Sequence, residues 1–106
     1  MTQLQIQAQI DSITDQLIKK YKPQKIFLFG SSIAGKMTPD SDLDFLIIKD
    51  DKKIFHDRVA EVYGLVKKDI AADFIVVTPE EFNKRLQLGD PFFKSIALEG
   101  RVLYGG

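Results

Sequence analysis

The chain contains no cysteine, and that absence excludes several kinds of chemistry together. Its 106 residues can form no disulfide, no thiolate nucleophile and no thiolate metal site. The same absence fits a reducing compartment, and we expect a cytoplasmic protein. The single histidine, His56, has no second histidine or cysteine with which to form a metal site. We therefore expect it on a helix surface.

An excess of charge of one sign is also missing. The 15 basic residues balance the 15 acidic ones, so the formal net charge is +0. The broad positive field that holds a protein to nucleic acid is absent, and a nucleic-acid partner is not expected. No apolar run approaches the length that spans a bilayer, and the first residues do not form a basic segment followed by an apolar one. We expect no membrane association.

The length and the 44% hydrophobic content fit one domain, residues 1–106, with one modest core. Apolar residues at helical spacing predict two amphipathic helices, and Pro23 ends the first of them. Short apolar runs rich in β-branched and aromatic residues predict strands. In chain order, the predicted elements are a helix at 4–21, strands at 25–29 and 43–48, a helix at 52–68 and a strand at 72–77.

The last third of the chain begins with a strong helix start. Thr78 can cap the helix, Pro79 suits its first position, and Glu80 and Glu81 place acids in the first turn. The residues that follow suggest two short helices and a last short strand ending near Tyr104. Helices that alternate with strands predict an α/β fold, with a small sheet flanked by helices.

Two acids begin the second predicted strand. Asp42 and Asp44 are two residues apart, so both side chains lie on one face while Leu43 and Phe45 point to the other. Two close carboxylates repel each other unless a cation lies between them, and hard oxygen ligands favour Mg²⁺. Asp73 begins the third strand and can join the pair if the two strands are neighbours. Three carboxylates facing one triphosphate predict a two-metal site.

A glycine precedes these acids and predicts an anion site. Gly30 closes the first strand and permits close backbone approach, and the amides of Ser31 and Ser32 can receive a phosphate at the start of a helix. Any such helix must be brief, because Pro39 interrupts it.

Two other phosphate or metal motifs fit less well. The run from Gly30 to Lys36 nearly matches a Walker loop, but Met37 replaces the Ser or Thr that such a loop needs. The acids at 40, 42 and 44 imitate the start of a calcium loop. Phe45 replaces its turn glycine, however, and Asp51 stands in place of the final Glu.

Together these segments resemble a known family. Leu28-Phe29-Gly30-Ser31, a ten-residue gap, the run from Pro39 to Ile47 and the later strand acid are similar to the minimal nucleotidyltransferases of the DNA polymerase β superfamily. The likeness covers most of the chain. It implies a palm-like mixed sheet and the transfer of a nucleotidyl group from a nucleoside triphosphate such as ATP.

The resemblance also implies roles for individual residues. Gly30 and Ser31 would hold the β- and γ-phosphates, and Asp42 and Asp44 would bind the metals. Asp73 would bind the catalytic metal and help to activate the acceptor hydroxyl.

One departure from the family pattern leaves an alternative open. Many members carry arginine directly before the glycine that matches Gly35, whereas this chain has Ala34. The nearest cation is Lys36: either it takes over the contact with the triphosphate, or triphosphate binding is weaker than in those members. The alternative is a catalytically weakened subunit that binds a nucleotide or a partner and neutralises that partner by complex formation.

The resemblance extends to a partner. Proteins of this minimal type are similar to the antitoxin halves of pairs whose other half is a helical HEPN ribonuclease toxin. It implies a hetero-oligomer in which AMP is transferred to a tyrosine of the toxin. Phe92 and Phe93 are expected in the core, or at such an interface if they are exposed.

Overall fold

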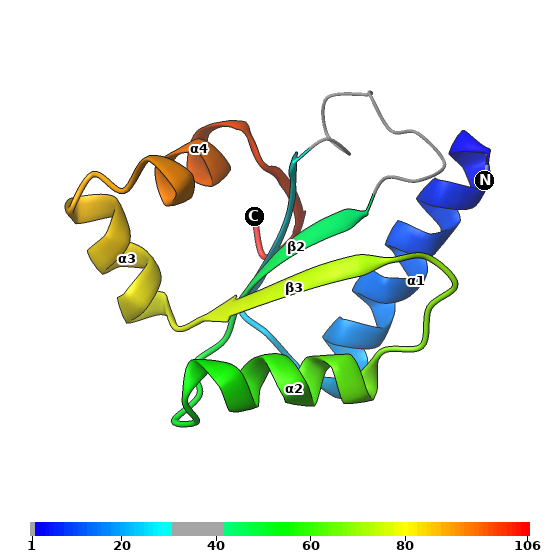
Figure 1. Ribbon diagram of the computed structural model, residues 1–106, viewed down its shortest axis with the longest axis horizontal. Helices are drawn as coiled ribbons and strands as arrows, with labels where there is room; N and C mark the ends of the chain where they lie inside the picture. Colours follow the sequence, from blue (N-terminus) through cyan, green and yellow to red (C-terminus); the bar gives the residue numbers. More distant parts are fainter. Residues whose placement is uncertain (1, 31–41) are drawn as a thin grey trace.

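The computed structural model describes residues 2–30 and 42–106, and it shows an α/β fold with a mixed sheet flanked by helices (Figure 1). The predicted fold class is confirmed. The elements are α1 (Gln3–Lys20), β1 (Lys25–Phe29), β2 (Leu43–Ile48), α2 (Phe55–Leu65), β3 (Ala72–Val77), α3 (Pro79–Gln87), α4 (Pro91–Glu99) and β4 (Arg101–Tyr104). The brief helix predicted at Ser31 lies outside the described residues.

The sheet has four strands in the order β3-β2-β1-β4. Strand β1 runs antiparallel to both β2 and β4, whereas β2 and β3 are parallel. The parallel pairing sets Asp44 opposite Asp73, and the antiparallel pairing sets Phe29 opposite the same Asp44. The end of β1 therefore meets the beginnings of β2 and β3 at one end of the sheet.

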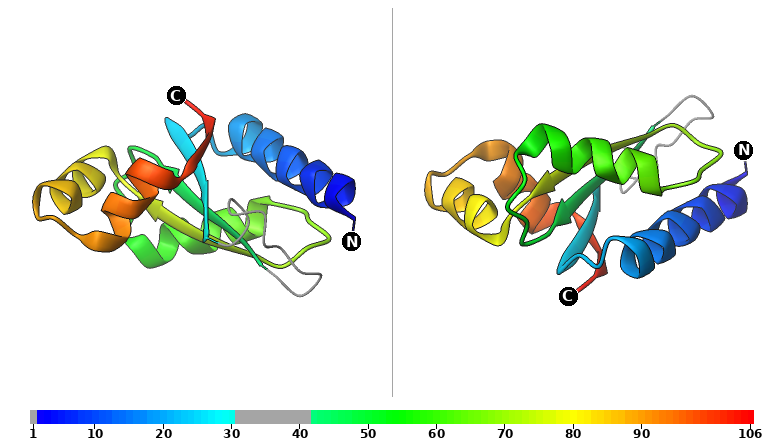
Figure 2. Two further views of the ribbon diagram at one scale, coloured as in Figure 1. Left: turned by 90° about the horizontal axis from the view of Figure 1, so that it is seen from above. Right: turned by 90° about the horizontal axis from the view of Figure 1, so that it is seen from below.

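Side chains along β2 alternate between two hydrophobic clusters, one on each face. Leu43, Phe45 and Ile47 are buried against α1 and α2, while Leu46 and Ile48 are buried on the face covered by α3 and α4. Figure 2 shows the two helix pairs from above and below. This alternation is the period-two pattern of a strand buried on both faces.

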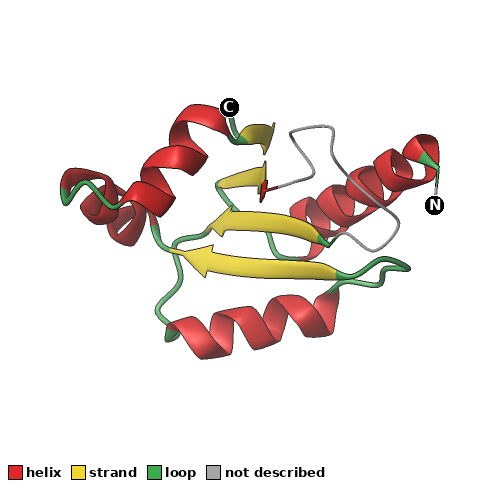
Figure 3. Ribbon diagram, turned by 45° about the horizontal axis from the view of Figure 1, so that its top comes forward, coloured by secondary structure: helices red, strands yellow, loops and turns green. Residues whose placement is uncertain are grey.

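The second helix pair covers only part of its face. Helices α3 and α4 lie over the far end of β2 and β3, away from the residues with which these strands begin (Figure 3). Neither α3 nor α4 therefore covers the part of the face where β2 and β3 begin, which carries Asp44 and Asp73.

The prediction of a helix at 52–68 was wrong at both ends, because α2 begins at Phe55 and ends at Leu65. Lys53 precedes it in a turn in which its amide donates to Asp51 Oδ1 at 2.8 Å. Val66 already has an extended backbone, with φ −95° and ψ 125°, yet its side chain is buried beside α2. Its apolar side chain thus continued the helical pattern past the true helix end.

The predicted start of α3 is confirmed. Thr78 and Glu81 form a capping box, and Pro79 stands in the first turn. Within residues 2–30 and 42–106, none of the helices combines the length and the apolar character needed to cross a membrane.

Candidate active site

Three acids lie together at the end of the sheet where β2 and β3 begin. Asp44 and Asp73 are register partners on the parallel strands β2 and β3, and Asp42 precedes Asp44 by two residues. Asp44 is half-buried, whereas Asp42 and Asp73 are exposed. The sequence predicted that Asp73 can join the pair if the third strand lies beside the second, and β3 does lie beside β2. Asp44 and Asp73 take strand positions that face away from the cluster packed on α1 and α2, and Asp42 directly precedes β2.

The three carboxylates are coupled through their charges. Burial raises the pKa of Asp44, and the negative charges of Asp73 and Asp42 raise this pKa further. Among residues 2–30 and 42–106, no positive charge offsets these effects on Asp44, and a bound cation would do so.

The three acids do not form a preformed metal-binding cage among the described residues. No group of three or more acidic, histidine or cysteine side chains is already gathered into a metal-binding cluster in the described part of the chain. Mg²⁺ does not require such a cage, since it commonly takes one or two protein carboxylates and completes its shell with water and substrate phosphates. The oxygen ligands of Asp42, Asp44 and Asp73 fit this ion chemically.

Gly30 packs directly against the half-buried acid. Its φ is +81°, and a Cβ atom at this position would lie 2.4 Å from Asp44 Oδ2. A side chain therefore cannot be added without moving the carboxylate. The turn that the sequence assigned to phosphate binding thus begins in contact with the predicted metal ligand. Ser31, Ser32, Ala34 and Lys36 lie outside the described residues.

Tyr63 of α2 also reaches the acids. The Tyr63 hydroxyl lies 3.5 Å from Asp73 Oδ1 and 3.3 Å from the carbonyl oxygen of Ala72, and it accepts the Phe74 amide at 3.3 Å. Its ring packs edge-on against the Phe74 ring, with centroids 5.0 Å apart. The only signal in the sequence was a hydroxyl on an otherwise apolar helix face.

Two cavities lie on the α3 and α4 side of the sheet, and Phe92 lines both of them. The β1 cavity has a volume of about 390 Å³ and touches the Gly30 turn; it is lined by Phe29, Gly30, Phe92, Ser95, Ile96, Glu99 and Gly100. The β3 cavity has a volume of about 370 Å³; it is lined by Phe55, Ile75, Val77, Glu81, Arg85, Phe92 and Phe93. The prediction that Phe92 and Phe93 belong to the core holds for Phe93, which packs against the second cluster, while Phe92 is 43% exposed.

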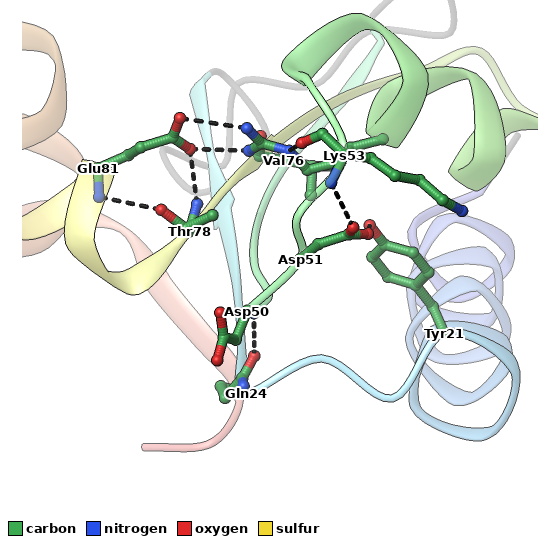
Figure 4. A network of polar contacts seen from close by, with 9 residues as sticks. Tyr21, Gln24, Asp50, Asp51, Lys53, Val76, Thr78 and Glu81 are labelled. Carbon is green, nitrogen blue, oxygen red and sulfur yellow. Dashed lines mark hydrogen bonds and ion pairs between the residues drawn. The ribbon is translucent and has the colours of Figure 1, made fainter.

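A buried arginine fixes the wall of the β3 cavity. Arg58 of α2 is 4% exposed, and its guanidinium donates to Val76 O at 2.9 Å and to both carboxylate oxygens of Glu81 at 2.7 and 3.1 Å. Glu81 Oε1 also accepts the Thr78 amide at 2.8 Å (Figure 4). The hydrogen bond from Arg58 lowers the pKa of Glu81 to about 2. One ion pair therefore joins α2, β3 and the start of α3.

Comparisons with known proteins agree with this geometry. Residues 10–104 match the model of the nucleotidyltransferase domain. The chain is 35% identical over 99 residues to a protein of Methanocaldococcus jannaschii that is described as a putative protein adenylyltransferase. The alignment covers 90% of this chain and 94% of that relative. No solved structure gives a significant match.

Proposed function

The chain belongs to the nucleotidyltransferase domain family, and on that premise we propose that it transfers AMP from ATP to a tyrosine of a partner protein in a Mg²⁺-dependent reaction. The observation that supports this most directly is the register of β2 and β3, which sets Asp44 opposite Asp73. The contact between Gly30 and Asp44 adds the phosphate turn to the same place.

In this proposal each of the three acidic residues has a role in the reaction. Asp42, Asp44 and Asp73 would hold Mg²⁺, which would neutralise charge on the triphosphate. Asp73 accepts the proton of the acceptor hydroxyl. The acceptor oxygen forms a bond to the α-phosphorus, the bond from that phosphorus to the bridging oxygen breaks, and pyrophosphate leaves with the electron pair.

The proposed partner is a HEPN-type toxin, and the chain would act as its antitoxin in a cytoplasmic hetero-oligomer. The sequence resemblance supports this partner, and the net charge of +0 suits a protein substrate better than a polynucleotide. The description of the archaeal relative as a protein adenylyltransferase points to the same substrate class. Ala34, where many family members carry arginine, supports the second candidate, a subunit that neutralises its partner by binding alone.

The test is co-expression of the chain with the protein encoded by the neighbouring gene, with intact-mass measurement of both. We expect AMP adducts on the partner. Asp44→Asn should reduce their rate of formation at least about a hundredfold, because loss of one fixed electrostatic contact commonly costs that much. Asp15→Asn on α1 is the matched control, since it removes one exposed carboxylate from the other side of the sheet.

The variants also separate chemistry from folding. Without metal, Asp44→Asn should be at least as stable as the wild type, because the substitution removes repulsion from Asp73 and Asp42. Full transfer by Asp44→Asn would refute the assigned site. A tight complex without adducts would favour the binding subunit, and no association would refute the antitoxin assignment.

A further inference from the structure

The β3 cavity lies on the face of β3 that also carries one of the three acids, Asp73. Ile75 and Val77 follow Asp73 by two and four residues, so all three occupy the same face of β3. A strand rises about 3.3 Å per residue, which places Ile75 roughly 6 to 7 Å along the strand from Asp73. The Ile75 end of the cavity is therefore about one ring length along the strand from Asp73, the residue proposed to accept the acceptor's proton.

The walls of this cavity are aromatic and accessible. Phe55 is 49% exposed and Phe92 is 43% exposed, and Phe93 meets Phe92 edge-on with centroids 5.3 Å apart. Exposed aromatic side chains that gather around a hollow commonly mark a binding site. The volume of about 370 Å³ lies within the range of roughly 300 to 1,000 Å³ that small-ligand pockets occupy. Rings packed in this way offer edges and faces to a further aromatic ring.

The two cavities differ in their position relative to the predicted phosphate turn. The β1 cavity includes Gly30, so it adjoins the predicted phosphate turn and suits the nucleoside side of the substrate. In phosphoryl-type transfer the attacking and leaving oxygens stand roughly in line on opposite sides of phosphorus. The β3 cavity lies farther along the strand that carries Asp73, and Phe92 lines both it and the β1 cavity.

We propose that the β3 cavity binds the aromatic ring of an acceptor tyrosine and directs its hydroxyl toward Asp73. The inference rests on the proposed function. It adds where the acceptor side chain binds and why tyrosine is selected over other hydroxyl residues. A phenol carries its hydroxyl at the far end of a flat ring, so the ring contacts Phe55, Phe92 and Ile75 while the oxygen extends toward the acid. A serine or threonine leaves these walls uncovered and is a poor acceptor.

Binding can be tested without any reaction. We would titrate N-acetyl-tyrosinamide into the ¹⁵N-labelled chain and follow the amide signals, with N-acetyl-serinamide as the control probe. The tyrosine probe should give saturable shifts at Ile75, Val77 and Phe93, and the serine probe should not. Phe55→Ala should weaken binding of the tyrosine probe about fivefold, since one aromatic contact is worth about 1 kcal/mol. Leu98→Ala, an exposed residue of α4 that lines neither cavity, should leave binding unchanged.

The outcomes for the two proposals are distinguishable. Equal shifts with the serine probe, shifts at Ser95 and Gly100 in place of Ile75, or displacement of the tyrosine probe by ATP would each overturn the acceptor site. Phe55→Leu provides a second variant that keeps an apolar side chain and removes only the ring; unchanged affinity in both Phe55 variants would also overturn it. Saturable tyrosine binding in a chain that transfers no nucleotide would instead refute the proposed function alone.

Discussion

At the scale of single residues, the candidate site depends on a position that can carry no side chain. Gly30 combines a positive φ with contact to Asp44, and these two constraints have different consequences. The first affects the backbone and therefore stability. The second affects where the carboxylate lies and therefore the proposed chemistry.

Gly89 allows the two effects to be separated. Its φ of +73° is close to the +81° of Gly30, but a Cβ atom there would meet nothing within 4 Å. Gly30→Ala and Gly89→Ala should each lower the free energy of unfolding by about 1 to 2 kcal/mol, the cost of a left-handed alanine. Only Gly30→Ala should also lower nucleotide transfer, by about tenfold or more, because its methyl group displaces the Asp44 carboxylate. Urea unfolding and a transfer assay on both variants check this, and equal transfer rates would contradict it.

At the scale of elements, helix α2 protects the outer edge of the sheet beside the acids. The Tyr63 hydroxyl binds the Phe74 amide and lies within reach of the Ala72 carbonyl, and Arg58 donates to the carbonyl of Val76. These backbone groups lie on the side of β3 away from β2. An unprotected edge strand can pair with other chains, so these contacts keep β3 and Asp73 in place.

The ion pair between α2 and α3 should stabilise the fold measurably. Glu81→Gln leaves the buried Arg58 guanidinium without its charged partner, while the glutamine oxygen can still accept the Thr78 amide. We expect a loss of about 1 to 2 kcal/mol near neutral pH, limited by the solvent exposure of Glu81. Glu80→Gln is the matched control in the same first turn and should cost less than about 0.5 kcal/mol. Denaturant unfolding measures both.

The ion pair between Arg58 and Glu81 should make the free energy of unfolding depend on pH in a known direction. The pKa of Glu81 in the folded chain is about 2, below its ordinary value of 4.5. Its stabilising contribution is therefore fully present above pH 4.5 and is lost as the pH falls toward 2. The stability difference between the wild type and Glu81→Gln should shrink across that window. A difference that stays constant from neutral pH to pH 2 would contradict the ion-pair explanation.

At the scale of the whole molecule, two hydrophobic clusters share one sheet. Leu46 and Ile47 are neighbours in β2, yet each is completely buried in a different cluster. Because β2 contributes side chains to both clusters, loss of packing in one cluster should also destabilise the other. The chain should therefore unfold in one cooperative transition, as predicted for a single domain.

Substitutions in β2 test this coupling. Leu46→Ala and Ile47→Ala should each lower the unfolding free energy by about 2 to 5 kcal/mol, whereas the exposed Leu4→Ala should change it by less than about 0.5 kcal/mol. The NMR methyl signals of Ile13 and Ile96, one from each cluster, should disappear at the same denaturant concentration in every variant. Separate transitions for these two signals would refute the prediction of a single domain.

Much of this protein was determined by its sequence alone. Apolar periodicity predicted the strands, the capping residues predicted the start of α3, and the spacing of Asp42 and Asp44 placed them on one face. These properties depend on a few consecutive residues, whose backbone preferences and side-chain directions are set locally. The same local reasoning failed at Val66, because an apolar side chain packs equally well just past a helix end.

Only the tertiary structure decided which distant residues meet. Asp73 lies opposite Asp44 because β3 pairs in parallel with β2, and the packing of helices on both faces of the sheet sets that register. The contact of Gly30 with Asp44 and the approach of Tyr63 to Asp73 follow from the same arrangement. The two cavities lined by Phe92 form where α3 and α4 pack against the sheet, which no local pattern specifies.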